Sequence, residues 1–139
     1  MKTFFTITLM VLVAGVLTGC GFVKGKPAAD QAIAKFHQLY NQGDLETIWN
    51  NADPQFREAS GKSKYQEFLG AVERKLGKVT SSSNTDFNIN TSNFKTTVHM
   101  TQQTSFEKGQ GTESFTFALH GTNAVLVGYH IESMDLITK

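Results

Sequence analysis

Residues 63–79, SKYQEFLGAVERKLGKV, decide the fold, because the spacing of the hydrophobic residues changes at their end. The apolar residues up to position 76 recur at spacings of three and four, which predicts one face of an amphipathic helix. They are Tyr65, Phe68, Leu69, Val72 and Leu76. Gly77 is a typical helix end, and after Val79 apolar and polar residues alternate, as in half-buried strands. Helices before this point and strands after it predict an α+β domain.

Two further helices are expected upstream. Residues 29–42 carry apolar side chains at helical spacing, and Asp44 is placed to cap a second, short helix. Asp53-Pro54 then predicts a capped turn that presents Phe56, because proline is favoured at the first helical position. Ser63 and Gln66 match a capping box at the start of the third helix. The sequence therefore predicts three N-terminal helices.

The second half of the chain predicts four antiparallel strands joined by tight turns. The turns are expected at 92–93, 107–111 and 121–123, where glycine, serine and asparagine gather. The last strand, from Ala124 to about Leu136, is apolar on both faces in its first half, which is typical of a covered strand. We expect the three helices to cover one face of this four-stranded meander.

The N-terminus has the features of a secretory signal. A short basic start, Met1-Lys2, precedes 14 apolar or small residues from Phe4 to Leu17, and small residues follow. A transmembrane helix needs about 20 apolar residues, so this run is too short to be a comfortable span. The sequence therefore predicts a leader that is removed.

The end of that leader, Leu17-Thr18-Gly19-Cys20, resembles the lipobox of bacterial lipoproteins. The resemblance implies that residues 1–19 are removed, that Cys20 is acylated, and that the lipid bilayer is a partner. Gly21 follows Cys20 where inner-membrane lipoproteins of enteric bacteria tend to have aspartate. This implies a position on the outer membrane, facing the periplasm. The alternative is an ordinary secretory signal followed by a free thiol.

The mature chain divides into two parts. Residues 20–28 are expected to form the lipidated cysteine and a tether, whose glycines and proline interrupt regular structure and which spans at most roughly 28 Å. Residues 29–139 form a single domain of ordinary size. Removal of Lys2 with the leader leaves 12 basic and 12 acidic residues, and this balance argues against a nucleic-acid partner.

The domain also resembles a known superfamily. The residues that carry the resemblance are 36–44 (FHQLYNQGD), 48–57 (IWNNADPQFR) and 68–79. They are similar to small bacterial domains of unknown function in the nuclear-transport-factor-2-like, or cystatin-like, superfamily, several of which are lipoproteins. The resemblance implies a curved sheet wrapped around a long helix, a cone with a pocket. Members usually have a strand between the second and third helices, and here only Phe56–Ser60 can supply it.

Two groups of side chains are candidates for a site. Tyr40, Trp49 and Tyr65 can line a pocket between helices and sheet, although core packing is the alternative. If Met100 pairs with Leu119, His99 lies opposite His120, within reach of a shared metal. Histidines on a polar sheet face are the favoured interpretation of that pair, with no cofactor.

The sequence shows no recognisable catalytic group. We expect no acidic residue on the apolar face of the strands, because Glu113 is assigned to a turn, and Glu132 and Asp135 fall near the end of the last strand. Nucleophile and phosphate-loop motifs are lacking. We therefore expect a non-enzymatic envelope lipoprotein that binds a protein partner or a small apolar ligand near the membrane. A small isomerase or hydrolase that uses the cone pocket is the alternative.

Overall fold

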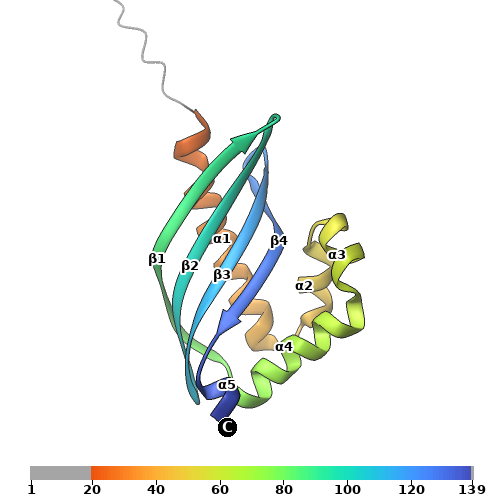
Figure 1. The fold of residues 1–139 in the computed structure, drawn as a ribbon, viewed down its shortest axis with the longest axis vertical. Coiled ribbons are helices and arrows are strands. Elements are labelled where there is room, and N and C mark those ends of the chain that lie inside the picture. Colours follow the sequence, from red (N-terminus) through yellow and green to blue (C-terminus); the bar gives the residue numbers. More distant parts are fainter. Residues whose placement is uncertain (1–19, 139) are drawn as a thin grey trace, which may run out of the picture.

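Residues 20–138 fold as four helices, a four-stranded sheet and a final helical turn (Figure 1). The computed structural model describes residues 20–138, with side chains from residue 24 onward. The predicted leader, 1–19, and the side chain of Cys20 lie outside the described residues. Among the helices that are described, none is long and apolar enough to cross a membrane.

The elements have the following bounds. The helices are α1 (Cys20–Gln42), α2 (Leu45–Asn51), α3 (Pro54–Ser60), α4 (Lys62–Leu76) and the short α5 (Asp135–Thr138). The strands are β1 (Val79–Ser92), β2 (Lys95–Phe106), β3 (Gly109–His120) and β4 (Asn123–Glu132).

The strands pair antiparallel in the order β1-β2-β3-β4, and α1 runs along one face of this sheet (Figure 1). Alternate residues of the two central strands are buried toward the helices, as expected for a sheet covered on one side. They include Val98, Met100, Phe115 and Phe117. The predicted α+β class and antiparallel meander are confirmed.

The helix count differs from the prediction, with four helices rather than three before the sheet. The Asp53-Pro54 turn continues as α3, because the Asp53 carboxylate accepts the Gln55 amide at 2.8 Å and Pro54 starts the helix. Gly61, in a left-handed conformation, ends it. Residues 56–60 are therefore helical and supply no strand between α2 and α4.

The helix caps were predicted with mixed success. The Asp44 carboxylate accepts hydrogen bonds from both the amide and the hydroxyl of Thr47, which confirms it as the cap of α2. The capping box at Ser63 is wrong, since α4 already begins at Lys62 after Gly61. The Gln66 side chain donates to Glu46 of α2 instead, at 3.1 Å.

The first helix begins nine residues before its predicted start. It is helical from Cys20, with Pro27 inside it, and its second turn packs against the sheet. A Cβ atom built on Gly25 would lie 3.0 Å from Ile89 Cδ1 and 3.3 Å from side-chain atoms of Val98 and Leu119. The absence of a side chain lets α1 approach the strands closely here. The expected tether is therefore folded against the domain from Gly25 onward.

The junction between the helices and the sheet is fixed by Asn41, near the end of α1. Its side-chain amide donates to the Val79 carbonyl at 2.9 Å and accepts the Val79 amide at 2.8 Å, in the manner of a neighbouring strand. The change in hydrophobic period after Val79 coincides with this contact.

The pairing of β2 with β3 is shifted from the prediction. Gly109 and Gly111 belong to β3, so the connection is a two-residue turn in which Phe106 pairs with Gly109. Met100 therefore lies opposite Phe115 rather than Leu119. Both glycines are packed tightly, because a Cβ on Gly109 would collide with Asp135 and one on Gly111 would lie 3.1 Å from Ile131 Cδ1.

Candidate functional site

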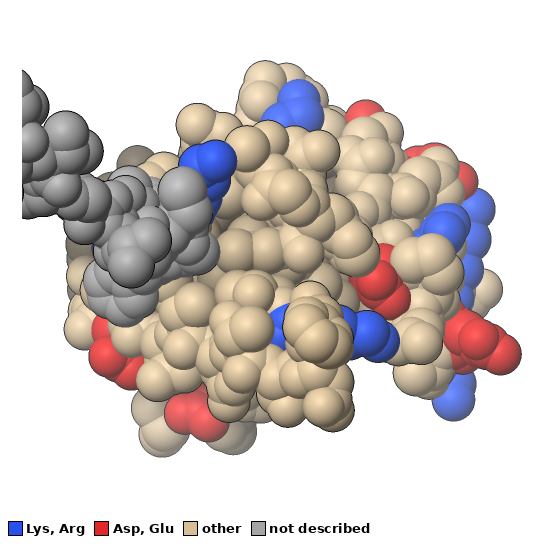
Figure 2. Space-filling model, turned by 90° about the horizontal axis from the view of Figure 1, so that it is seen from above, with Lys and Arg blue, Asp and Glu red and all other residues tan. Residues whose placement is uncertain are grey.

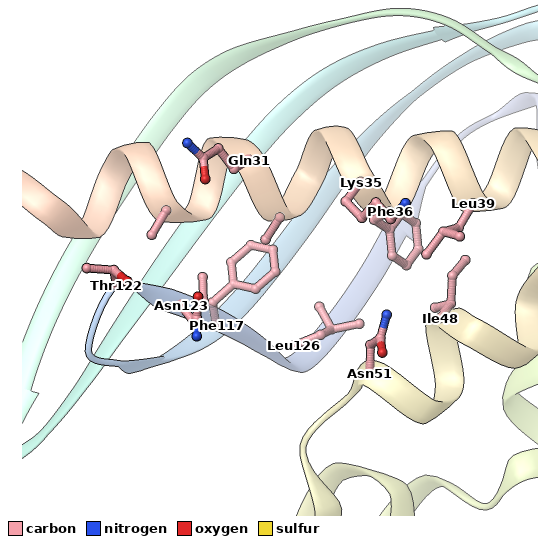
Figure 3. Close-up of a pocket in the computed structure, with 13 residues that line it drawn as sticks. Gln31, Lys35, Phe36, Leu39, Ile48, Asn51, Phe117, Thr122, Asn123 and Leu126 are labelled. Atoms are coloured by element: carbon pink, nitrogen blue, oxygen red, sulfur yellow. The ribbon is translucent and has the colours of Figure 1, made fainter.

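The structure contains an apolar cavity of about 500 Å³ between α1, α2 and the β3–β4 hairpin (Figure 3). Its apolar lining comes from Ala28, Ala32, Phe36, Leu39, Ile48, Phe117, Ala124 and Leu126. Polar side chains join them from Gln31, Lys35, Asn51, Thr122 and Asn123. This size and lining are typical of sites for small, largely apolar ligands.

The cavity follows from the sizes of the side chains along one stripe of α1. Ala28, Ala32, Phe36 and Leu39 recur at helical spacing on this side of the helix. The two alanines leave space over the hairpin, whereas Phe36 and Leu39 fill it closer to α2. The opposite wall includes Leu126, whose backbone carbonyl accepts the Asp53 amide at 2.8 Å and so joins β4 to the loop after α2.

Lys35 is the one charged residue among those that line the cavity. Its side chain is exposed, and its ammonium group donates to the Gln38 side chain at 3.3 Å. A single cation at the edge of an apolar cavity favours a ligand with an apolar body and an anionic or polar end.

The aromatic residues predicted to line a pocket do not line this one. Tyr40, Trp49 and Tyr65 are all buried in the core, at 2%, 7% and 6% exposure. The Tyr40 hydroxyl donates to the Gly77 carbonyl at 3.0 Å, where α4 ends. Trp49 and Tyr65 pack on each other and on Phe56, and the buried Tyr65 hydroxyl has no hydrogen-bond partner among the described residues. Core packing is therefore the role that the structure gives them.

A second feature is a buried carboxylate that accepts three hydrogen bonds. Glu113 on β3 is 1% exposed. Its Oε2 accepts the Thr104 hydroxyl at 2.6 Å and His37 Nε2 at 2.7 Å, while its Oε1 accepts the Tyr129 hydroxyl at 2.6 Å. These donors come from β2, α1 and β4, so the carboxylate links the first helix to three strands of the sheet.

The assignment of Glu113 to a turn is wrong, and so is the expectation that no acid lies on the apolar face. Because β3 begins at Gly109, Glu113 lies in phase with Phe115 and Phe117 on the helix-covered side. The period-two spacing of Gly111, Glu113, Phe115 and Phe117 indicates that Glu113 shares a strand face with the two phenylalanines. The prediction missed this because it assigned residues 107–111 to a loop.

Burial and nearby carboxylates keep the phenol groups of Tyr129, Tyr65 and Tyr40 neutral. Burial raises the pKa of Tyr129 well above its usual value, and the nearby Glu113 carboxylate raises it further. Burial and Glu113 also raise the pKa of Tyr65, and burial together with three glutamates raises that of Tyr40. A neutral Tyr129 is the hydrogen-bond donor that the Glu113 carboxylate requires.

The structure separates the two histidines considered as metal ligands. His99 lies opposite Thr116 and shares a hydrogen bond with its hydroxyl at 3.0 Å, whereas His120 lies opposite Asn123 at the hairpin end. The predicted pairing fails because it assumed the longer β2–β3 loop. Within residues 20–138, no group of three or more histidine, cysteine or acidic side chains is arranged to hold a metal ion.

The comparisons with known proteins identify a similar fold and no family. No protein-family model matches the sequence, and no curated protein matches it. The solved structure of Bdellovibrio bacteriovorus Bd1075 matches with a TM-score of 0.53 and 12% sequence identity. The match covers 84% of this chain but only 43% of that one, so this chain spans less than half of the Bd1075 chain. At this identity the likeness is one of fold alone.

Proposed function

We propose that this chain is a lipid-anchored envelope protein, attached through Cys20, whose domain binds a small apolar or amphipathic ligand in the cavity beside α1. The cavity of about 500 Å³ carries the ligand part of the proposal, because its lining is mostly apolar with Lys35 at its edge. The sequence Leu17-Thr18-Gly19-Cys20 supports the anchor. Gly21 after the cysteine favours the outer membrane, facing the periplasm.

The arrangement of α1 against the sheet also supports a place in the cystatin-like superfamily. A long helix along one face of a bowed antiparallel sheet is the core of that cone (Figure 1). The cavity lies between that helix and one edge of the sheet, where a cone would open. This chain has α3 in place of the strand that members usually have between their second and third helices.

An isomerase or hydrolase is the second candidate, and the contact between His37 and Glu113 is the observation that favours it. A histidine and a carboxylate 2.7 Å apart can act as an acid–base pair. However, neither residue lines the cavity, and three donors already occupy the Glu113 oxygens. We therefore favour a structural role for this pair and a binding role for the domain.

The ligand proposal is tested with anilinonaphthalene sulfonate, a fluorescent probe with an apolar body and one anionic group. The lipidated full chain in mild detergent should bind the probe, and dodecanoate should displace it. Ala32→Trp fills the cavity and should abolish binding, while Ala34→Trp, two residues along on the exposed side of α1, should not. Lys35→Gln should weaken binding.

Two results would overturn the ligand proposal. One is probe binding that Ala32→Trp leaves unchanged relative to Ala34→Trp, and the other is no displacement by dodecanoate. A protein partner would then be the remaining form of the binding hypothesis.

A further inference from the structure

The tip of the β1–β2 hairpin carries a fully exposed phenylalanine. Phe94 is fully exposed, at 106% of its reference area, and it is one of two residues that connect the strands. A single exposed apolar side chain is ordinary on a protein surface. Its position in the turn makes this one unusual.

The backbone at the tip is one that phenylalanine rarely adopts. Asn93 and Phe94 have φ angles of 49° and 62°, both left-handed, as in the hairpin turn whose usual sequence is Asn-Gly. Asparagine tolerates this region, whereas a bulky residue there is an outlier. Neither turn geometry nor packing therefore explains a phenylalanine at position 94, and a role outside the domain would.

The tip lies at the end of the molecule where α1 begins (Figure 1). Gly25 of α1 lies beside Ile89 of β1, because a Cβ on Gly25 would lie 3.0 Å from the Ile89 side chain. From this point α1 extends roughly 8 Å back to Cys20, at about 1.5 Å per residue. Strand β1 extends about 13 Å from Ile89 to the turn, at about 3.3 Å per residue. Because the helix and the strand are inclined to each other, the tip and the start of α1 lie at about the same height in Figure 1.

The charges at this end suit a membrane surface. The described charged residues of the first turns of α1 and of the hairpin tip are Lys24, Lys26, Asp30 and Lys95, and Asp30 pairs with Lys26 at 2.8 Å. The view onto this end shows a largely uncharged surface with charged side chains around it (Figure 2). An aromatic side chain among lysines fits the interface of a bilayer that contains anionic lipid.

We propose that the hairpin tip inserts Phe94 into the interfacial layer of the membrane that holds Cys20. The domain then contacts the membrane at two points, the acylated Cys20 and Phe94. This rests on the proposed lipid anchor. The contact orients the long axis of the domain away from the bilayer. It also brings the β3–β4 turn, whose Thr122 and Asn123 line the cavity, to the membrane-facing end.

The test uses the lipidated full chain in vesicles of phosphatidylethanolamine and phosphatidylglycerol. Phe94→Trp adds a fluorophore at the tip, and Met134→Trp adds one at an exposed site at the opposite end of the sheet. The parent protein, which has only the buried Trp49, supplies the background. We expect brominated phospholipids to quench the added emission of Phe94→Trp and shift it to shorter wavelength. The emission of Met134→Trp should remain unquenched.

Flotation of the same samples separates the two proposals. If the protein floats with the vesicles while the added emission of Phe94→Trp is unquenched, the hairpin contact is refuted and the anchor stands. A tip that binds a protein partner instead would give this result. If the protein does not float, the anchor fails and the hairpin contact fails with it.

Discussion

Replacing the buried Glu113 by alanine should be among the most destabilising single changes in this domain. The side chain is 1% exposed and accepts hydrogen bonds from His37, Thr104 and Tyr129. In Glu113→Ala, the Thr104 hydroxyl keeps a contact with Ser82 at 3.1 Å, but His37 Nε2 and the Tyr129 hydroxyl lose the partner found here. A buried donor left without its partner costs about 1–3 kcal/mol, so the two donors together should cost about 2–6 kcal/mol.

The conservative variant Glu113→Gln should cost less, about 1–2 kcal/mol, because a hydrogen bond is exchanged rather than removed. The amide oxygen can replace Oε2, which accepts from His37 and Thr104, while the amide nitrogen faces the Tyr129 hydroxyl, which can accept in turn. Stability should therefore rise from Glu113→Ala to Glu113→Gln to the wild type. This order is specific to a carboxylate that accepts hydrogen bonds from three donors.

Urea unfolding measures these differences, with the buried Trp49 as the fluorescent reporter. Glu132→Ala is the matched control, since this acid is exposed on the neighbouring strand and should change stability by less than about 0.5 kcal/mol. If Glu113→Ala costs no more than Glu132→Ala, the carboxylate does not hold the helix and sheet together, and the reasoning is refuted.

Three further outcomes follow from the same structure. Phe94→Gly should raise stability by about 0.5–1 kcal/mol in urea unfolding, because glycine relieves the left-handed conformation; a loss of stability would mean that Phe94 has a packing role. Because the pKa values of Tyr40, Tyr65 and Tyr129 are all raised on folding, their contribution to stability is complete below about pH 10 and is lost as the pH rises further. Tyrosinate absorbance should therefore appear together with unfolding, and tyrosine ionisation in a still-folded protein would contradict the burial. Gly25→Leu should cost about 1–3 kcal/mol by forcing α1 away from the strands, and an unchanged unfolding midpoint would show that this turn does not dock.

Local chemistry made the α+β class and several helix ends predictable. The caps at Asp44 and Asp53-Pro54 and the stop at Gly77 depend only on neighbouring residues, and each lies at a helix end in the structure. The start of α1 could not be predicted in this way. Glycine and proline at positions 25 and 27 disfavour a helix locally, and it is the close contact of Gly25 with the sheet that holds the helix there.

The buried carboxylate was missed because register depends on loop length. Treating 107–111 as a loop shifted the pairing of β2 and β3, placed His99 opposite His120, and left Glu113 beside a turn. A two-residue turn places Glu113 on the buried face and joins it to His37, 76 positions away. The cavity was equally hidden, since it arises where Ala28 and Ala32 face a hairpin distant in the sequence.

The anchor at Cys20 is the central claim, and the intact mass of the protein recovered from bacterial membranes tests it most directly. The account predicts a chain that begins at Cys20 and carries a thioether-linked diacylglyceryl group. It also predicts that Cys20→Ser leaves the leader uncleaved and the lipid absent. A chain with an unmodified Cys20 thiol, recovered without the membrane, would contradict the account.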